Sequence, residues 1–435
     1  MPTAITSNLV DLGKGEISRA LFVDESLYRE EQERIFARAW LYIGHESQIP
    51  EPGDFLLSRM GEESVILTRD RDRRIRVFLN SCRHRGMRVC RYDEGNTSTF
   101  YCPYHGWSYG LDGSLKGVTD HNKAYLPDSF DRKDWGLVEV GRLANFKGTI
   151  WATWDKAAPA FEDYLGEAKE LFELAFTAWD GEGDVELLGS AQKWVIPSNW
   201  KIVAENFIGD LLHNVSHQSV DKVGIGPNDE PGRRDKGYDY APASYPGGHG
   251  MLCAVFPPGP MPRMYTRSPA TSDYFAEQWA KRQMLLGARA RTVPSVGTTF
   301  PNMSFHGHQP RTILVAHPNA VGETEMWRVY FVDRKAPPEV KDFLRRYYLS
   351  YSGPAGLTEQ DDMENWNYAT SAGRGVIARR HAYHYKAGLG MTRSHELVPG
   401  IVSSHKNTET NARGFYRRWS EYMKDGHLAG EGGEE

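Results

Sequence analysis

Apolar side chains recur at helical spacing in five stretches of the chain. In residues 24–40 they are interleaved with charged residues, which predicts an N-terminal helix. The other four stretches follow residue 155, at 162–178, 199–217, 338–350 and 408–424. Strand-like segments such as 326–332 lie between these helices. The pattern after residue 155 therefore predicts an α+β body.

Between about Leu41 and Asp155 the pattern changes to short runs rich in β-branched and aromatic residues. Residues 64–68, 75–79 and 149–154 are such runs, and turn residues such as Asp112-Gly113 separate them. This part of the chain predicts a small all-β module. The charged stretch 69–74 lies between two of its strands and predicts a solvated hairpin turn.

Residues 225–263 are rich in Gly and Pro and predict a long loop before the later strands. A loop of that length in a compact domain usually forms a lid or a wall of a binding site. The C-terminal residues 430–435 contain only Gly and Glu and predict a solvated tail.

Composition narrows the class of protein. The chain has 435 residues and a net charge of −5, with acidic and basic residues intermixed, so it predicts a folded protein of two or three domains without a nucleic-acid footprint. No apolar run reaches the roughly 18 residues that span a bilayer, and residues 1–6 do not resemble a signal peptide. Four cysteines cannot form a disulfide scaffold in a chain of this length. We expect a cytoplasmic protein whose partner is a small molecule or another protein.

Two cysteines and two histidines form the first chemical constellation. Cys82 and His84 are separated by one residue, Cys102 and His105 by two, and 17 residues lie between the pairs. Such a set can hold zinc, or a [2Fe–2S] cluster with two thiolates on one iron and two imidazoles on the other. Zinc fingers segregate their Cys and His pairs, whereas each loop here carries one of each. The spacing therefore favours a Rieske cluster, and Cys90 and Cys253 are expected to be ordinary buried thiols.

The same segment contains a G-x-S-x-G pattern, Gly106-Trp107-Ser108-Tyr109-Gly110. In α/β-hydrolases a helix follows the nucleophilic serine of this motif. Here residues 111–117 have turn and strand character, so we interpret the match as coincidence.

The second constellation lies on the predicted helix 199–217, which Ser198-Asn199 can cap. Asn206, Asp210, His213 and His217 are spaced by four, three and four residues, which would place them on one helix face. Its apolar flanks suggest a buried setting, in which carboxylates and imidazoles need a partner such as a metal ion.

A third ligand would complete the two-His-one-carboxylate triad of non-haem Fe(II) enzymes. The segment 353–366 supplies the candidates. Thr358 and Asp361 fit a helix-capping pair, which would occupy Asp361 and leave Asp362 as the ligand. Spacing alone leaves both aspartates open.

These motifs together resemble the large (α) subunit of the Rieske non-haem iron oxygenases that hydroxylate aromatic rings, over nearly the whole chain. The resemblance rests on the Cys/His loops, on residues 199–201 and 205–213, and on residues 353–356 with 359–362. It implies a [2Fe–2S] cluster held by Cys82, His84, Cys102 and His105, and a mononuclear Fe(II) held by His213, His217 and Asp362.

The resemblance also implies an architecture. Residues 41–155 would form an all-β Rieske domain inserted in an α+β catalytic domain, residues 156–435, whose antiparallel sheet is flanked by helices. Residues 1–40 would be a helical segment that packs on the catalytic domain. The expected assembly is a cyclic trimer of α subunits, either alone or with a β subunit (α3β3), in which one subunit's cluster lies near the next subunit's iron.

Individual roles follow from the same resemblance. Asp210 matches a carboxylate that links a cluster-binding His to an iron-binding His across the subunit interface, and Asn206 matches an amide near the iron. Trp107 matches an aromatic residue beside the cluster. One departure is that three residues separate His213 from His217, whereas many ring dioxygenases have four or five there.

The implied reaction is dihydroxylation of an aromatic ring with O2 to a cis-dihydrodiol. It needs two external electrons, and the chain has no G-x-G-x-x-G turn for a nicotinamide cofactor of its own. A reductase, and a ferredoxin, would therefore supply electrons from NAD(P)H. A monooxygenase or demethylase, a pure Rieske electron carrier and a zinc-organised binding module are the alternatives.

Substrate evidence in the sequence is indirect. Eight residues are predicted by position to line the pocket: Phe207, Leu211, Leu212, Val215, Asn302, Ser304, Ser352 and Leu357. This largely apolar set favours an aromatic hydrocarbon, and the motif wording is most similar to polycyclic-arene dioxygenases of soil bacteria. Arg263 and Arg267 lie near the Gly/Pro-rich stretch and would instead suit an aromatic acid such as phthalate.

Overall fold

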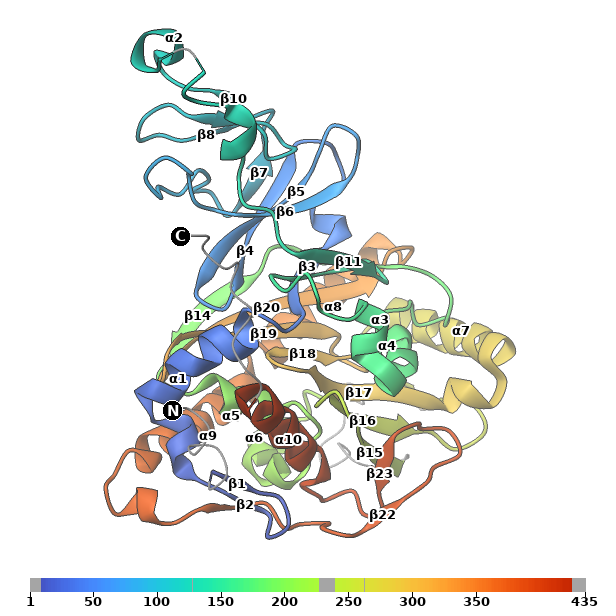
Figure 1. Ribbon diagram of the computed structural model, residues 1–435. Helices are drawn as coiled ribbons and strands as arrows, with labels where there is room; N and C mark the ends of the chain where they lie inside the picture. Colours follow the sequence, from blue (N-terminus) through green and yellow to red (C-terminus); the bar gives the residue numbers. More distant parts are fainter. Residues whose placement is uncertain (1–8, 127, 227–238, 262, 425–435) are drawn as a thin grey trace. The chain divides into compact units, whose positions relative to one another are not determined.

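The computed structural model describes residues 9–126, 128–226, 239–261 and 263–424 (Figure 1). The chain divides into two compact units, one of residues Phe36–Pro159 and one of Met1–Ile35 with Ala160–Glu435. The chain thus leaves the larger unit once, forms the smaller one, and returns. Within the described residues, no helix is both long and apolar enough to cross a membrane.

The smaller unit is built of short antiparallel strands. Its four-stranded sheet has the order β6-β5-β4-β7, and two three-stranded sheets have the orders β11-β12-β3 and β10-β9-β8. The strands are β3 (Leu41–His45), β4 (Asp54–Met60), β5 (Glu63–Arg69), β6 (Ile75–Leu79), β7 (Glu94–Asn96), β8 (Phe100–Tyr101), β9 (Ser108–Tyr109), β10 (Leu115–Gly117), β11 (Arg142–Phe146) and β12 (Thr149–Thr153).

Two sequence predictions are confirmed in this unit. The charged stretch 69–74 is the β5–β6 hairpin turn, which the Asp70 N–H closes by donating to the carbonyl of Arg74 at 2.9 Å. Ser108 lies in strand β9, and the chain then turns into β10 rather than a helix. The G-x-S-x-G pattern is therefore not a nucleophile elbow.

The larger unit is organised by a ten-stranded antiparallel sheet of order β13-β20-β19-β18-β17-β16-β15-β23-β22, with β14 also paired to β20. This confirms the predicted α+β class with an antiparallel sheet. The strands are β13 (Val185–Leu187), β14 (Gln192–Ile196), β15 (Asp239–Ser244), β16 (Gly250–Val255), β17 (Thr292–Thr299), β18 (Met303–His306), β19 (Thr312–Ala320), β20 (Glu323–Asp333), β22 (Thr392–Arg393) and β23 (Ile401–Ser403).

Helices surround this sheet (Figure 1). Those that matter for the site are α5 (Trp200–Asn206), the 3-10 segment η6 (Leu212–His217), α6 (Gln218–Val223), α8 (Pro338–Tyr351), α9 (Leu357–Gly373) and α10 (Thr410–Lys424). The others include α3 (Phe161–Leu165), α4 (Lys169–Ala175) and α7 (Pro269–Leu286). The predicted helices 338–350 and 408–424 are confirmed as α8 and α10.

The N-terminal segment belongs to the larger unit. Helix α1 (Glu25–Glu31), capped by Asp24, continues as a π-helical turn over Gln32–Phe36, so the helix predicted to residue 40 ends earlier. The buried carboxylate of Glu31 accepts hydrogen bonds from the indoles of Trp200 and Trp419 at 2.9 and 2.7 Å and pairs with Lys201 at 2.6 Å. This charge network fixes α1 against α5 and α10.

Two predicted segments differ from the structure because glycines interrupt or reverse the chain. The helix predicted at 162–178 divides into α3 and α4 around Gly166, whose φ is +53°. Of the loop predicted at 225–263, residues 227–238 and 262 lie outside the described residues. Residues 239–255 are a β15–β16 hairpin of the central sheet, whose turn is closed by the Tyr245 N–H donating to His249 O at 3.0 Å.

Candidate metal centres and active site

The four predicted cluster ligands lie on two loops with the same backbone pattern. In the first loop the Cys82 N–H donates to the carbonyl of Met87 at 2.8 Å, and the Gly86 N–H donates to the carbonyl of Cys82 at 2.9 Å. The second loop repeats this geometry from Cys102, whose N–H donates to the carbonyl of Trp107 at 2.8 Å. Two matched loops can present one thiolate and one imidazole each to a shared cluster.

The donor atoms are gathered at the loop tips. Cys82 and Cys102 are buried, and the rings of His84 and His105 lie 4.5 Å apart between centroids. Trp107 stacks on His84 at 5.0 Å, so it flanks the donor set as predicted. Burial raises the pKa of the Cys102 thiol, so a thiolate at this position needs a cation beside it to balance its charge.

The second constellation does not lie on one helix, and the predicted helix 199–217 is wrong in this respect. Asn199 caps α5 by accepting the N–H of Lys201 at 3.1 Å, but α5 ends at Asn206. Gly209 has a φ of +114°, and the chain then forms the 3-10 segment η6 that carries His213 and His217.

The structure nevertheless brings His213, His217 and Asp362 together. Nε2 of His217 lies 3.2 Å from Oδ1 of Asp362, and Nε2 of His213 lies 3.7 Å from the same oxygen. Among the described residues, this is the one group of three or more potential ligands found with its donor atoms mutually within 4.8 Å. Two imidazole nitrogens and a carboxylate oxygen are a donor set suited to non-haem Fe(II).

The state of Asp362 supports a metal between these donors. Asp362 is 5% exposed, and its Oδ1 forms no hydrogen bond in the described structure despite the two nearby ring nitrogens. A buried carboxylate oxygen without a hydrogen bond is costly, whereas a cation shared with two imidazoles satisfies it. The residues present therefore fit a mononuclear iron.

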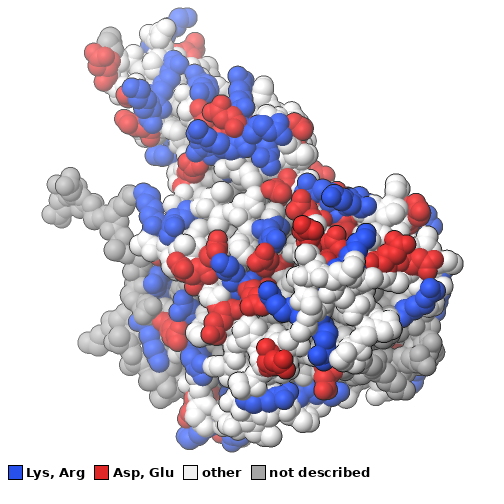
Figure 2. Space-filling view, turned by 90° about the vertical axis from the view of Figure 1, so that its right-hand side faces the viewer, with Lys and Arg blue, Asp and Glu red and all other residues white. Residues whose placement is uncertain are grey.

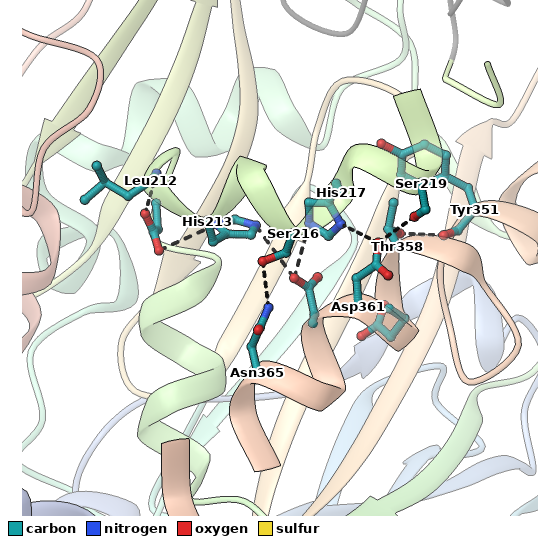
Figure 3. Close-up of polar contacts among 12 residues, drawn as sticks. Leu212, His213, Ser216, His217, Ser219, Tyr351, Thr358, Asp361 and Asn365 are labelled. Carbon is teal, nitrogen blue, oxygen red and sulfur yellow. Dashed lines mark hydrogen bonds and ion pairs between the residues drawn. The ribbon is translucent and has the colours of Figure 1, made fainter. Parts of the chain in front are cut away.

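Two further aspartates contact the outer nitrogens of the histidines (Figure 3). Oδ2 of Asp361 lies 3.3 Å from Nδ1 of His217 and accepts the Ser219 hydroxyl at 3.0 Å. Oδ2 of Asp210 lies 3.5 Å from Nδ1 of His213, while its Oδ1 accepts the Leu212 N–H at 2.7 Å. Carboxylates in this position set the tautomer and orientation of metal-binding histidines.

The capping role predicted for Asp361 is wrong. Helix α9 begins after Gly356 without a side-chain cap, and the Thr358 hydroxyl donates to the carbonyl of Tyr351 instead. Asp361 therefore contacts His217 instead of capping the helix. The sequence analysis did not predict this contact.

A cavity of about 150 Å³ adjoins the three donors. Of the eight predicted pocket residues, Phe207 and Leu211 line it, as does the predicted amide residue Asn206. The other six are not among its lining residues: Leu212, Val215, Asn302, Ser304, Ser352 and Leu357. Val215, on the 3-10 segment η6, is 72% exposed.

The remaining wall of the cavity comes largely from the central sheet. Five of these lining residues lie on strands of the sheet: Tyr240, Leu252, Ser295, Val296 and His306. His308 and Gln309 follow strand β18, and Tyr351 comes from α8. No sequence motif marked these residues, since the tertiary structure, chiefly the pairing of the strands, brings them together. The predicted wall in the 225–263 stretch is represented by Gly226, Tyr240 and Leu252.

No Lys or Arg lines the cavity in the described structure. Arg263 pairs with Asp273 at 3.1 Å, and Arg267 donates to the carbonyl of Gly224 at 3.4 Å. The buried Arg328 is paired at 2.6 Å with Glu359, which itself lines the cavity. Among the described residues, the cavity therefore offers an aromatic carboxylate no cationic side chain.

A second cavity of about 240 Å³ lies beside Asp210 and contains Glu205 in its wall. The Tyr385 hydroxyl donates to Glu205 at 2.8 Å, and the Tyr416 hydroxyl also donates to it. Desolvation raises the pKa of Glu205 to about 8, although both phenol hydrogen bonds oppose this shift. Nothing beyond its place in a motif singled out Glu205 in the sequence.

Comparisons with known proteins agree with this geometry. The model of the Rieske [2Fe–2S] domain matches residues 39–138, and that of the ring hydroxylating alpha subunit catalytic domain matches residues 176–425. The biphenyl dioxygenase subunit alpha of Paraburkholderia xenovorans (strain LB400) is 37% identical over 441 residues, which cover 98% of this chain and 94% of its own.

Two further relatives show the same relationship. The benzene 1,2-dioxygenase subunit alpha of Pseudomonas putida is 37% identical and covers 97% of this chain and 94% of its own. A crystal structure of naphthalene 1,2-dioxygenase from Rhodococcus sp. with bound indole superposes with a TM-score of 0.82 at 32% identity, covering 95% of this chain and 97% of that chain.

Proposed function

Because the chain belongs to the ring-hydroxylating α-subunit family and is a Rieske non-haem iron dioxygenase component, we propose that His213, His217 and Asp362 hold its mononuclear iron. Cys82, His84, Cys102 and His105 would hold the [2Fe–2S] cluster. When bound, these groups supply one-electron transfer and dioxygen activation. The proposed reaction converts an aromatic ring, O2, two electrons and two protons into a cis-dihydrodiol.

One observation carries the iron assignment: three buried or half-buried donors converge within 4.8 Å at the wall of a cavity. The protein's own residues orient these donors. Asp210 and Asp361 hold the outer nitrogens of His213 and His217, so that both Nε2 atoms face Asp362. Phe207 and Leu211 supply apolar surface for the ring.

Iron analysis of Asp362→Ala tests this assignment. The variant is expected to lose the mononuclear iron and all turnover but to keep the cluster irons and their visible spectrum. Asp221→Ala is the matched control, since Asp221 lines the same cavity outside the donor triad. Retention of mononuclear iron and activity in Asp362→Ala would transfer the ligand role to Asp361 or Glu364.

The cavity favours a neutral aromatic ring of the hydrocarbon type over an acid such as phthalate. No cationic side chain lines it in the described structure, whereas Asp210, Asp221 and Asp362 do. Turnover with ¹⁸O2 tests the reaction class, because a dioxygenase places two labelled oxygens in a diol and a monooxygenase places one label in its product.

Family membership also implies electron-transfer partners and an oligomeric assembly. We propose that the partners are a ferredoxin and an NAD(P)H reductase, and that the assembly is a cyclic α3 trimer with an accompanying β subunit. None of the four cysteines forms a disulfide, which, with the proposed dependence on NAD(P)H, favours the cytoplasm as the site of action.

The smaller unit has a basic surface at its first cluster loop. Four exposed arginines lie there, Arg83, Arg85, Arg88 and Arg91. Figure 2 shows Lys and Arg side chains gathered over this unit, in its upper part. A basic surface beside the cluster suits an acidic electron carrier.

A further inference from the structure

Gln309 presents a buried amide to the substrate cavity. It follows strand β18, is 6% exposed, and lines the cavity beside the donor triad. The hydroxyls of Tyr265 and Tyr348 lie 2.5 and 2.6 Å from its Oε1. These distances are typical of O–H···O bonds and short for N–H···O, so both phenols donate to the amide oxygen. The amide orientation is thereby fixed.

Its nitrogen is then left as a donor. Nε2 of Gln309 has no hydrogen-bond partner among the described residues, although the atom is buried. Ser295 on strand β17 also lines the cavity, and its buried hydroxyl has no hydrogen-bond partner there either. The Gly307 N–H donates to the carbonyl of Ser295 at 3.2 Å, which places these two segments side by side. Two unsatisfied donors therefore occur in neighbouring segments of one cavity wall.

The character of these donors selects the acceptor. An amide and a hydroxyl are neutral, and no Lys or Arg lines the cavity in the described structure. The neighbouring His308 stays neutral at physiological pH, because burial lowers its pKa to about 4. Neutral donors among cavity carboxylates suit an uncharged oxygen rather than a carboxylate.

We propose that Gln309 and Ser295 form a polar subsite that recognises an uncharged hydrogen-bond acceptor, such as an ether or carbonyl oxygen, carried by the aromatic substrate. This inference rests on the proposed function and specifies its substrate class. Hydrocarbon rings still fit the apolar surface of Phe207 and Leu211, but they leave both donors to water. A substituted ring with an acceptor in reach binds more tightly than its hydrocarbon isostere.

Methoxybenzene and ethylbenzene test the subsite because they have similar shapes and differ by an oxygen in place of a methylene. The wild-type enzyme is expected to prefer methoxybenzene in kcat/KM and in directly measured dissociation constant by about 2- to 10-fold. Ser295→Ala should reduce this preference. Gln309→Glu keeps an oxygen for the two phenols but removes the donor, and should abolish or reverse it.

Ser304→Ala is the matched control, since Ser304 is buried, bonds to Thr298 at 2.9 Å and does not line the cavity. It should leave the preference unchanged. Equal binding of the two compounds by wild type, or an unchanged preference in Ser295→Ala, would overturn the subsite and leave the donors to water alone. Failure of the iron-loaded enzyme to oxidise either ring would instead overturn the proposed function, while the binding ratio would still decide the subsite.

Discussion

The surroundings of the Glu205 carboxyl act on its pKa in opposite directions, and burial outweighs the hydrogen bonds. It lies in the wall of the second cavity and receives hydrogen bonds from two phenols. Asp210 and Glu409 add negative charge nearby, while Lys201 is engaged by Glu31. Glu205 forms no salt bridge in the described structure, so its neutral form is favoured in the folded protein.

The free energy of unfolding should therefore fall as the pH rises from about 4.5 to about 8. Its folded pKa is about 8, above the ordinary value of 4.5, so the folded state binds more protons than the unfolded chain between these values. The expected loss is at most about 1.4 kcal/mol per pH unit. Glu205→Gln should gain stability relative to wild type from pH 5 to pH 8, as measured by urea midpoints. The exposed Glu277→Gln is the control, and parallel curves for wild type and Glu205→Gln would refute the idea.

Asp361 should set the affinity for mononuclear iron without binding it. Its contact with Nδ1 of His217 leaves Nε2 to face Asp362. Asp361→Ala is expected to weaken iron binding by about 10- to 100-fold, and Asp361→Asn by less, because the amide oxygen still accepts a hydrogen bond. Iron dissociation constants measure this effect. Ser219→Ala keeps the histidine contact and should have little effect; unaltered affinity in Asp361→Ala would argue against the role.

At the scale of single residues, the resemblance predicted the donors and Asp210 next to an iron-binding histidine, but not the contact of Asp361 with His217. Cys82, His84 and His213 were predicted because metal chemistry restricts residue types and spacings, whereas spacing alone left Asp361 and Asp362 both open as the carboxylate ligand. Asp361 was assigned to helix capping, because a local motif offered it a plausible partner. Its real partner, His217, is 144 positions away in the sequence.

Among the elements, the break between α5 and η6 determines where the histidines point. Gly209 adopts a φ of +114°, and a Cβ there would lie 3.1 Å from Nδ2 of Asn411 and 3.2 Å from Cβ of Leu252. The glycine thus permits both the backbone turn and the close approach of strand β16.

Gly209→Ala should destabilise the protein by about 1–3 kcal/mol and lower its mononuclear iron content, since η6 must shift. Gly259→Ala separates crowding from backbone strain, because Gly259 has a φ of +119° but open space around its Cβ position. Thermal midpoints and iron-to-protein ratios provide the measurement. Equal effects of the two substitutions on iron content would mean that packing at Gly209 does not position η6.

The same break shows why element prediction succeeded in some places and failed in others. The strand predicted at 326–332 is confirmed within β20, and the helix predicted at 338–350 is confirmed as α8, since each has one uninterrupted pattern. The pattern at 199–217 also looked continuous. Hydrophobic spacing does not register a positive φ at one glycine, and histidines four apart remain neighbours after the helix tightens to 3-10 geometry.

For the whole molecule, the basic first cluster loop should govern the rate of electron delivery. Arg85→Glu is expected to slow reduction of the cluster by an acidic ferredoxin about tenfold at low salt and to flatten the decrease of the rate with ionic strength. Stopped-flow absorbance of the cluster measures both. Arg71→Glu is the control, because Arg71 is exposed in the β5–β6 turn, at the opposite end of β6 from the cluster loop. An identical response of the two variants would exclude local docking at this loop.

The sequence predicted the overall architecture more accurately than it predicted the residues that line the cavity. Short β-rich runs and helix-patterned segments are local features of the sequence, so the all-β and α+β classes of the two parts needed no tertiary information. The polar wall formed by Ser295 and Gln309 depends on the register of strand β17 against β18 and on the course of the chain after β18. The sequence therefore predicted a more apolar pocket than the structure contains.

Electron transfer between subunits is the consequence of the proposed trimer that can be tested most directly. Cys102→Ser should lose the cluster and keep the mononuclear iron, whereas Asp362→Ala should do the reverse, and each should be inactive alone. If the cluster of one subunit serves the iron of the next, then random trimers of the two variants contain a productive pair at about one interface in four. Coexpression should restore about a quarter of wild-type turnover per chain. Native mass spectrometry identifies the mixed trimers. If they remain inactive, electron transfer stays within one chain. If the protein is monomeric, the proposed trimer is wrong.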